Sequence, residues 1–87
     1  MTIVSENIDD QINQVLDNLS AILVAAGTSL DSVVKFTVFL TDLQHFGRVN
    51  ELMAERLSEP YPARAAIEVA GLPKEAKIEI DAIAHLN

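Results

Sequence analysis

The chain of 87 residues contains no cysteine and no tryptophan. The absence of cysteine excludes disulfide bonds, thiolate zinc sites and cysteine nucleophiles. Basic residues are also few, because six Lys and Arg stand against 13 Asp and Glu, which gives a formal net charge of −7. Binding to phosphate backbones or to an anionic membrane surface relies on clustered basic side chains. We therefore expect no nucleic acid and no membrane among the partners.

Long apolar runs are absent as well. No stretch approaches the ~18 apolar residues of a membrane-spanning helix, and the opening residues MTIVSENIDD do not form a basic leader followed by an apolar run. The two histidines, His45 and His85, lack neighbours at the spacing of metal ligands, so no metal site is expected. These absences favour a soluble, cytoplasmic protein.

Hydrophobic residues are plentiful, at 49% of the chain. We expect residues 1–87 to form a single domain, and a domain of this length buries only about 60% of the surface that its unfolded chain exposes. Such a small domain is marginal alone, so association with further copies would stabilise it.

One amphipathic helix is indicated between residues 8 and 26. Asn7 can cap its first turn, where Asp9 and Asp10 suit the positive end of the helix dipole, and Gly27 can end it. Apolar residues recur at intervals of three and four, which predicts a helix with one buried face. These apolar residues are Ile8, Ile12, Val15, Leu16, Leu19, Ile22, Leu23 and Ala26.

The rest of the chain contains β-type segments around a second helical repeat, residues 43–57, which ends near Pro60. The first β-type segment is apolar on both faces, which is typical of a strand covered on each side. The order (β)αβαββ predicts an α/β (α+β) fold with two helices on one face of a sheet. The expected strands are residues 33–40, 63–70 and 77–84, and residues 2–4 are a possible end of an earlier strand.

Two charged residues, Arg64 and Glu79, interrupt apolar strands. Residue types alone allow Arg64 to be a solvated edge-strand arginine or a partner of Glu68. The second option is weak because residues i and i+4 of a strand lie roughly 13 Å apart. Glu79 fits the polar face of a half-buried strand. Most charged residues are simply solvated, so a ligand site needs a further argument.

That argument is a resemblance in residues 62–80. The run Pro62-Ala63-Arg64-Ala65 is followed at matching intervals by Ile67, Ala70 and Leu72, and then by Ile78-Glu79-Ile80. This pattern resembles the RidA (YjgF-like) family of reactive intermediate deaminases. Residues 11–43 resemble the family's first helix and the strand after it, and FGRVNEL, which contains Asn50, resembles the start of its second helix.

The resemblance implies a chorismate-mutase-like fold with a mixed sheet and a homotrimer with ligand sites in clefts between subunits. It implies hydrolysis of 2-imino acids, such as 2-iminopropanoate and 2-iminobutanoate, to 2-keto acids and ammonia without a cofactor. By the same resemblance Arg64 holds the substrate carboxylate, Glu79 positions the attacking water, and Asn50 lines the cleft.

The chain also departs from the family pattern. It is N-terminally short, because family members have further strands ahead of the first helix. Ala66 stands where cysteine is frequent, and Arg56 stands where relatives commonly have an aromatic residue. The shortness keeps an alternative open, namely a non-catalytic small-ligand-binding or assembly module derived from the family. A ribonuclease activity, also described for some members, is disfavoured by the net charge of −7.

Overall fold

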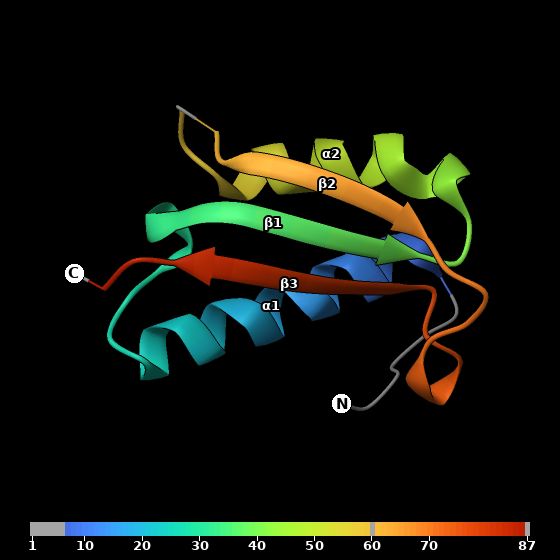
Figure 1. Ribbon diagram of the computed structural model, residues 1–87, viewed down its shortest axis with the longest axis horizontal. Coiled ribbons are helices and arrows are strands. Elements are labelled where there is room, and N and C mark those ends of the chain that lie inside the picture. The colour runs from blue at the N-terminus through green and yellow to red at the C-terminus, as the bar shows by residue number, and fades with distance from the viewer. Residues whose placement is uncertain (1–6, 60, 87) are drawn as a thin grey trace.

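The computed structural model describes residues 7–59 and 61–86. Two helices and three strands alternate along the chain in the predicted order αβαββ (Figure 1). The possible strand at residues 2–4 lies outside the described residues. The elements are α1 (Ile8–Ala25), β1 (Val33–Leu40), α2 (Phe46–Arg56), β2 (Ala63–Glu68) and β3 (Ile78–Ala84), with short 3₁₀ turns η1 (Leu30–Ser32), η2 (Leu43–His45) and η3 (Pro73–Glu75).

The predicted ends of α1 are confirmed. The side chain of Asn7 accepts hydrogen bonds from the backbone N–H groups of Asp9 and Asp10, which would otherwise lack partners in the first turn. Gly27 follows the helix with a φ of +88°, a conformation that costs glycine little. The backbone N–H of Thr28 then donates to the carbonyl of Leu23 at 2.9 Å, which closes the helix end.

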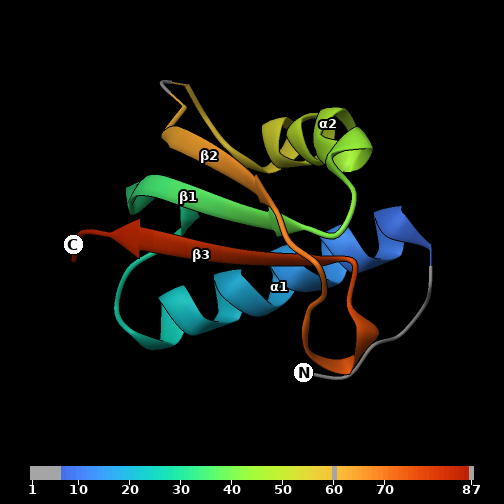
Figure 2. The same cartoon turned by 45° about the vertical axis from the view of Figure 1, so that its right-hand side comes forward.

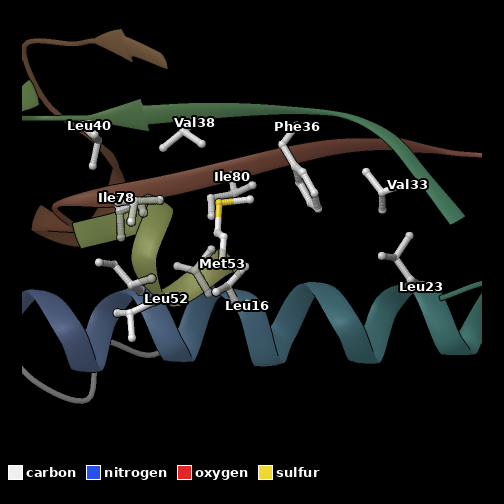
Figure 3. Close-up of a cluster of buried hydrophobic side chains, with 13 residues drawn as sticks. Leu16, Leu23, Val33, Phe36, Val38, Leu40, Leu52, Met53, Ile78 and Ile80 are labelled. Carbon is white, nitrogen blue, oxygen red and sulfur yellow. The ribbon is translucent and has the colours of Figure 1, made fainter. Parts of the chain in front are cut away.

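The sheet is mixed and has the order β2-β1-β3. β1 pairs in parallel with β2 and antiparallel with β3, so it is the central strand. Both helices pack on the same face of the sheet, as the turned view shows (Figure 2). The buried side chains between helices and sheet form one core (Figure 3). Its members are Ile12, Val15, Leu16, Leu23, Val33, Phe36, Val38, Leu40, Val49, Leu52, Met53, Ile78 and Ile80.

The opposite face of the sheet, called the open face below, has no covering element among the described residues. It consists of Ala63, Lys35 and Ile83 in one row, Ala65, Thr37 and Asp81 in the next, and Ile67, Phe39 and Glu79 in the third. Its exposed apolar residues include Ile83, which is 62% exposed, and Ile67, which is 46% exposed. The expectation that β1 is covered on both faces is therefore wrong for the single chain, because both helices use one side.

No helix in the described part of the chain is long and apolar enough to cross a bilayer.

Candidate functional site

Arg64 lies on β2 and points to the helix-covered side of the sheet. It is in register with Phe36, whose side chain is in the core, and side chains at paired positions share a face. The guanidinium Nη1 donates a hydrogen bond to Oδ1 of Asn50 on α2, at 2.5 Å. The structure therefore brings two of the predicted site residues together, at the β2 edge of the sheet.

The other two arginines of the chain have carboxylate partners. Arg48 donates from Nε and Nη2 to both carboxylate oxygens of Asp9, at 2.8 and 2.7 Å, and contacts Glu51 at 3.2 Å. Arg56 donates to Asp17 at 2.7 Å. Among the described residues Arg64 has no carboxylate within 4.0 Å. Its positive charge is therefore not balanced within the described part of the chain.

The Arg48 pair shows in which direction such a contact acts on a carboxyl group. The hydrogen bond from Arg48 lowers the pKa of Asp9; desolvation opposes this shift, and the positive charge of Arg48 adds a smaller lowering effect. The same contact raises the pKa of Arg48. A carboxylate ligand at Arg64 would receive the kind of stabilisation that Asp9 receives from Arg48.

Small side chains surround Arg64 on β2. Ala66 follows it on the same face of the strand, and Ala63 and Ala65 lie on the other. Glu68 is on the face of Arg64, but its carboxylate accepts the backbone N–H of Leu43 at 3.1 Å and so ties β2 to the turn before α2. The alternative of an Arg64–Glu68 pair is therefore not realised.

Glu79 lies on β3, in register with Phe39 on the open face. It is exposed and stands between the buried Ile78 and Ile80, so its side chain projects to the opposite side of the sheet from that of Arg64. The two residues are also separated by the central strand and by three positions along it, roughly 14 Å for ordinary strand spacings. One chain alone does not bring Arg64 and Glu79 together.

A polar residue that the sequence reasoning missed supports the strand of Glu79. Gln11 is buried in α1, and its Oε1 accepts the backbone N–H of Lys77 at 2.8 Å, immediately before β3 begins. The signal was present in the sequence, because Gln11 follows Ile8 by three positions and precedes Val15 by four. A polar residue on the apolar face of a helix requires a hydrogen-bond partner inside the fold.

A groove of about 620 Å³ lies between α1 and β3, away from Arg64 and Asn50. Gln14 and Asn18 on its helix side are hydrogen-bonded to each other at 3.0 Å. In residues 7–59 and 61–86, no group of three or more His, Asp or Glu side chains is placed to hold a metal ion. The residues lining the groove are Gln14, Val15, Asn18, Leu19, Ala21, Ile22, Glu79 and Ile80.

Comparison with known proteins extends over almost the whole chain. The model of the family described as Endoribonuclease L-PSP matches residues 1–86. Reactive Intermediate Deaminase A of Arabidopsis thaliana, a chloroplastic protein, is 51% identical over 83 residues, which are 95% of this chain and 44% of the relative. The chain spans about two thirds or less of the length of the curated relatives that it matches.

Solved structures agree with the sequence matches. RidA from an Antarctic Psychrobacter species has a TM-score of 0.91 at 50% identity, over 97% of this chain and 68% of that one. TdcF of Escherichia coli, solved with bound serine, has a TM-score of 0.85 at 40% identity, over 94% of this chain and 67% of that one.

These matches confirm the predicted fold class, a YjgF-like mixed sheet with two helices on one face. The cytoplasmic location stays a prediction, since one relative is chloroplastic. The family model, the identities near 50% and the shared fold all lead to the same assignment, and the chain belongs to the RidA/YjgF/L-PSP family, which includes proteins named reactive intermediate deaminases.

Proposed function

We propose that this chain hydrolyses 2-imino acids, such as 2-iminopropanoate and 2-iminobutanoate, to 2-keto acids and ammonia. The observation that carries the proposal is the half-buried guanidinium of Arg64, which has a neutral amide and no carboxylate as its partner among the described residues. Relatives named as reactive intermediate deaminases support an imine substrate, and TdcF with bound serine supports a ligand with a carboxylate beside a nitrogen.

Arg64 has the role of holding the substrate carboxylate. Asn50 occupies one N–H of the guanidinium, and the remaining N–H groups form a planar fork that matches two carboxylate oxygens. Asn50 is neutral, so it orients Arg64 without neutralising the positive charge of the guanidinium. A carboxylate held at two points fixes the neighbouring imine carbon. Catalysis then depends mainly on orienting a water molecule toward that carbon.

Glu79 has the role of general base. Its carboxylate accepts a proton from water while the water oxygen bonds to the imine carbon, which gives a carbinolamine. The proton then passes to the nitrogen, the C–N bond breaks, and the carbonyl of the keto acid forms as ammonia leaves. One imine and one water yield one keto acid and one ammonia, so no oxidant, reductant or cofactor is required.

The site requires two copies of the chain. Arg64 and Glu79 project from opposite faces of one sheet, and the open face that carries Glu79 is partly apolar and uncovered. A homotrimer in which the β2 edge of one copy meets the open face of the next would place Arg64 of the first copy near Glu79 of the second. Cyclic symmetry repeats such a contact at every interface and buries the open face.

The first test measures keto-acid release from 2-iminopropanoate that a dehydratase generates from serine. The wild-type chain should exceed the uncatalysed rate, and Arg64→Ala and Glu79→Gln should each return to it. Arg56→Ala is the matched control, because it removes another partly buried arginine, one that already has a carboxylate partner. Equal rates for wild type and Arg64→Ala would refute the proposed activity.

A mixing experiment tests the shared site. If each site takes Arg64 from one copy and Glu79 from another, co-refolding equal amounts of Arg64→Ala and Glu79→Gln should restore about a quarter of the sites, as random assembly in a ring predicts. No recovery, with the wild-type control active after the same treatment, would place both residues of a site in one copy. Sedimentation of the wild type should show three chains.

A non-catalytic binding or assembly module is the second candidate, favoured by the distance between Arg64 and Glu79 within one chain. It predicts binding of a keto acid such as pyruvate that depends on Arg64, without imine hydrolysis at any protein concentration. The ribonuclease activity suggested by the family's description is not proposed, because the net charge of −7 opposes binding to a polyanion.

A further inference from the structure

Two side chains of β2 bind the helical segment formed by η2 and α2. Arg64 donates to Asn50 in the second turn of α2, and Glu68 accepts the backbone N–H of Leu43 in η2 at 3.1 Å. Ala66 lies between the two on the same face of the strand. β2 therefore contacts this segment at two points, and one of them is the proposed carboxylate site.

Glu68 extends from a part of the sheet that is held in place. It is the last residue of β2 and is paired with Leu40, which is fully buried. The next backbone N–H, that of Val69, donates to the carbonyl of Leu40 at 2.9 Å. The carboxylate of Glu68 is thus attached to a strand end with a fixed position.

η2, in contrast, has little contact of its own with the core. None of its residues is buried, and it continues directly into α2, because His45 and Phe46 both have right-handed helical backbone angles. Among residues 43–48, the partly buried Phe46 is the apolar residue that packs against the core, and Val49 is the first that is fully buried. Hydrogen bonds therefore have a large part in locating the start of this segment.

Two acidic side chains supply such hydrogen bonds. Asp42 acts locally, since its Oδ1 accepts the N–H of Gln44 at 2.9 Å and its carbonyl accepts the N–H of His45 at 3.1 Å. Glu68 accepts the N–H of Leu43 from a different element, 25 positions away in the chain. The first N–H groups of a helical segment need acceptors of this kind. Both acids complete the turn, but only Glu68 ties it to β2.

We propose that Glu68 is a positioning residue for the ligand site, an inference that rests on the proposed function. By holding Leu43, Glu68 fixes the start of the helical segment against β2, and so the place of Asn50, which orients the guanidinium of Arg64. Residues 64 and 68 lie roughly 13 Å apart along the strand, so Glu68 does this without pairing with Arg64. Productive geometry is sensitive to displacements of about 1 Å, which gives such a tie an effect on ligand binding.

The first test measures the contact of Arg64 with Asn50 without any reaction. In NMR spectra of the wild-type chain, the Nη protons of Arg64 should exchange slowly with water, because Nη1 donates to Asn50. Glu68→Ala should speed this exchange toward the rate in Asn50→Ala. Glu68→Gln should keep the slow exchange, because an amide oxygen also accepts a backbone N–H. Asp42→Ala is the matched control, since it removes the other acidic acceptor of η2 and should leave the Arg64 signals unchanged.

The second test measures ligand binding with pyruvate as the probe. Glu68→Ala should weaken pyruvate binding about fivefold and raise KM for 2-iminopropanoate by a similar factor with kcat little changed, because the loss concerns the hold on the carboxylate. Adding Glu68→Ala to Asn50→Ala should cause no further loss of affinity, because both substitutions act through one contact. A purely structural role of Glu68 would lower the melting temperature and leave KM unchanged.

Two outcomes would overturn the proposal. Exchange at Arg64 could be unchanged in Glu68→Ala while a circular dichroism spectrum shows folded protein, or the losses of affinity from Glu68→Ala and Asn50→Ala could be additive. If Glu68→Ala does not fold, Glu68→Asp replaces it, because its carboxylate is one methylene shorter and does not reach Leu43. A wild-type chain that neither hydrolyses the imine nor binds pyruvate would refute the proposed function, and the exchange rates at Arg64 would still support or refute the role of Glu68.

Discussion

The three arginines of the chain lie in two regions, α2 and β2, and have different kinds of partner in each. Arg48 and Arg56 join α2 to α1, each through a carboxylate of α1. Arg64 joins β2 to α2 through the neutral amide of Asn50. All three are half-buried, so exposure does not distinguish them. Under the proposed function, the charge of the partner distinguishes the two arginines that pair with a neighbouring helix from the one that is available to a ligand.

The largest effect should follow from removing the arginine with the neutral partner. Arg64→Ala should lower kcat/KM for 2-iminopropanoate about 100-fold or more, because a two-point, charge-assisted contact with the carboxylate is lost. The melting temperature should change little, because Arg64 is on an edge strand and outside the core. Keto-acid release and thermal melting measure the two effects.

Arg64→Lys sharpens the same comparison. Lysine keeps the charge but cannot bind both carboxylate oxygens with a planar fork. Its kcat/KM should lie between those of wild type and Arg64→Ala. A rate equal to that of the wild type would mean that charge alone is needed at residue 64.

A smaller loss, this time of ligand affinity, should follow from giving Arg64 a carboxylate partner like those of Arg48 and Arg56. Asn50→Asp places a carboxylate beside Arg64, as Asp17 stands beside Arg56. The affinity for pyruvate should fall about tenfold, since the new carboxylate competes with the ligand for the guanidinium, while the free energy of unfolding should stay equal or rise by less than about 1 kcal/mol. Isothermal titration calorimetry and urea unfolding measure these changes.

Asn50→Ala is the control for that substitution. It removes the hydrogen bond to Arg64 without adding a charge, so it should cost less affinity than Asn50→Asp. Equal losses of affinity would indicate that Asn50 acts only by orienting Arg64. They would contradict the idea that a charged partner makes Arg64 less available to a ligand.

A still smaller effect is expected from the ion pair of Arg56 and Asp17, which joins α2 to α1. Breaking this pair should lower stability and leave activity unchanged. A double-mutant cycle with Arg56→Ala and Asp17→Ala should give a coupling free energy of about 0.5 kcal/mol, the usual size for an ion pair near the surface. The coupling should weaken in 1 M salt. Additive effects of the two substitutions would show that the 2.7 Å contact does not stabilise the folded chain.

Much of the fold could be predicted from local chemistry. The cap at Asn7 and the stop at Gly27 depend on hydrogen bonds and backbone conformation within one helix turn, so their residues are diagnostic in any sequence. The strand positions followed from β-branched residues and alternation. The two-sided apolar character of β1 predicted cover on both faces, whereas both helices of the described chain pack on one face.

The candidate site was predictable only in part. Alternation within a strand shows which residues share a face with Arg64 or with Glu79, but it does not relate the faces of two strands. Their relation depends on the sheet order and on the register of β2 and β3 against β1. The pairs of Arg48 with Asp9 and of Arg56 with Asp17 each span 39 positions in the chain, and no local pattern predicts partners at that distance.

The smallest effect should be a change of melting temperature at low pH that depends on the ion pair of Arg48 and Asp9. The hydrogen bond from Arg48 holds the pKa of Asp9 in the folded chain below its usual value of about 4. A carboxyl whose pKa is lowered by folding stabilises the fold above its unfolded pKa, and this contribution is lost as the pH falls through the folded pKa. The melting temperature of wild type should therefore exceed that of Asp9→Asn at pH 6, and the difference should shrink below about pH 4. Asp10→Asn removes a charge from the same helix turn, where the described residues offer no arginine partner, and should show no comparable convergence. If the melting temperatures of wild type and Asp9→Asn differ by the same amount from pH 6 to pH 2, the ion pair of Arg48 and Asp9 does not stabilise the fold.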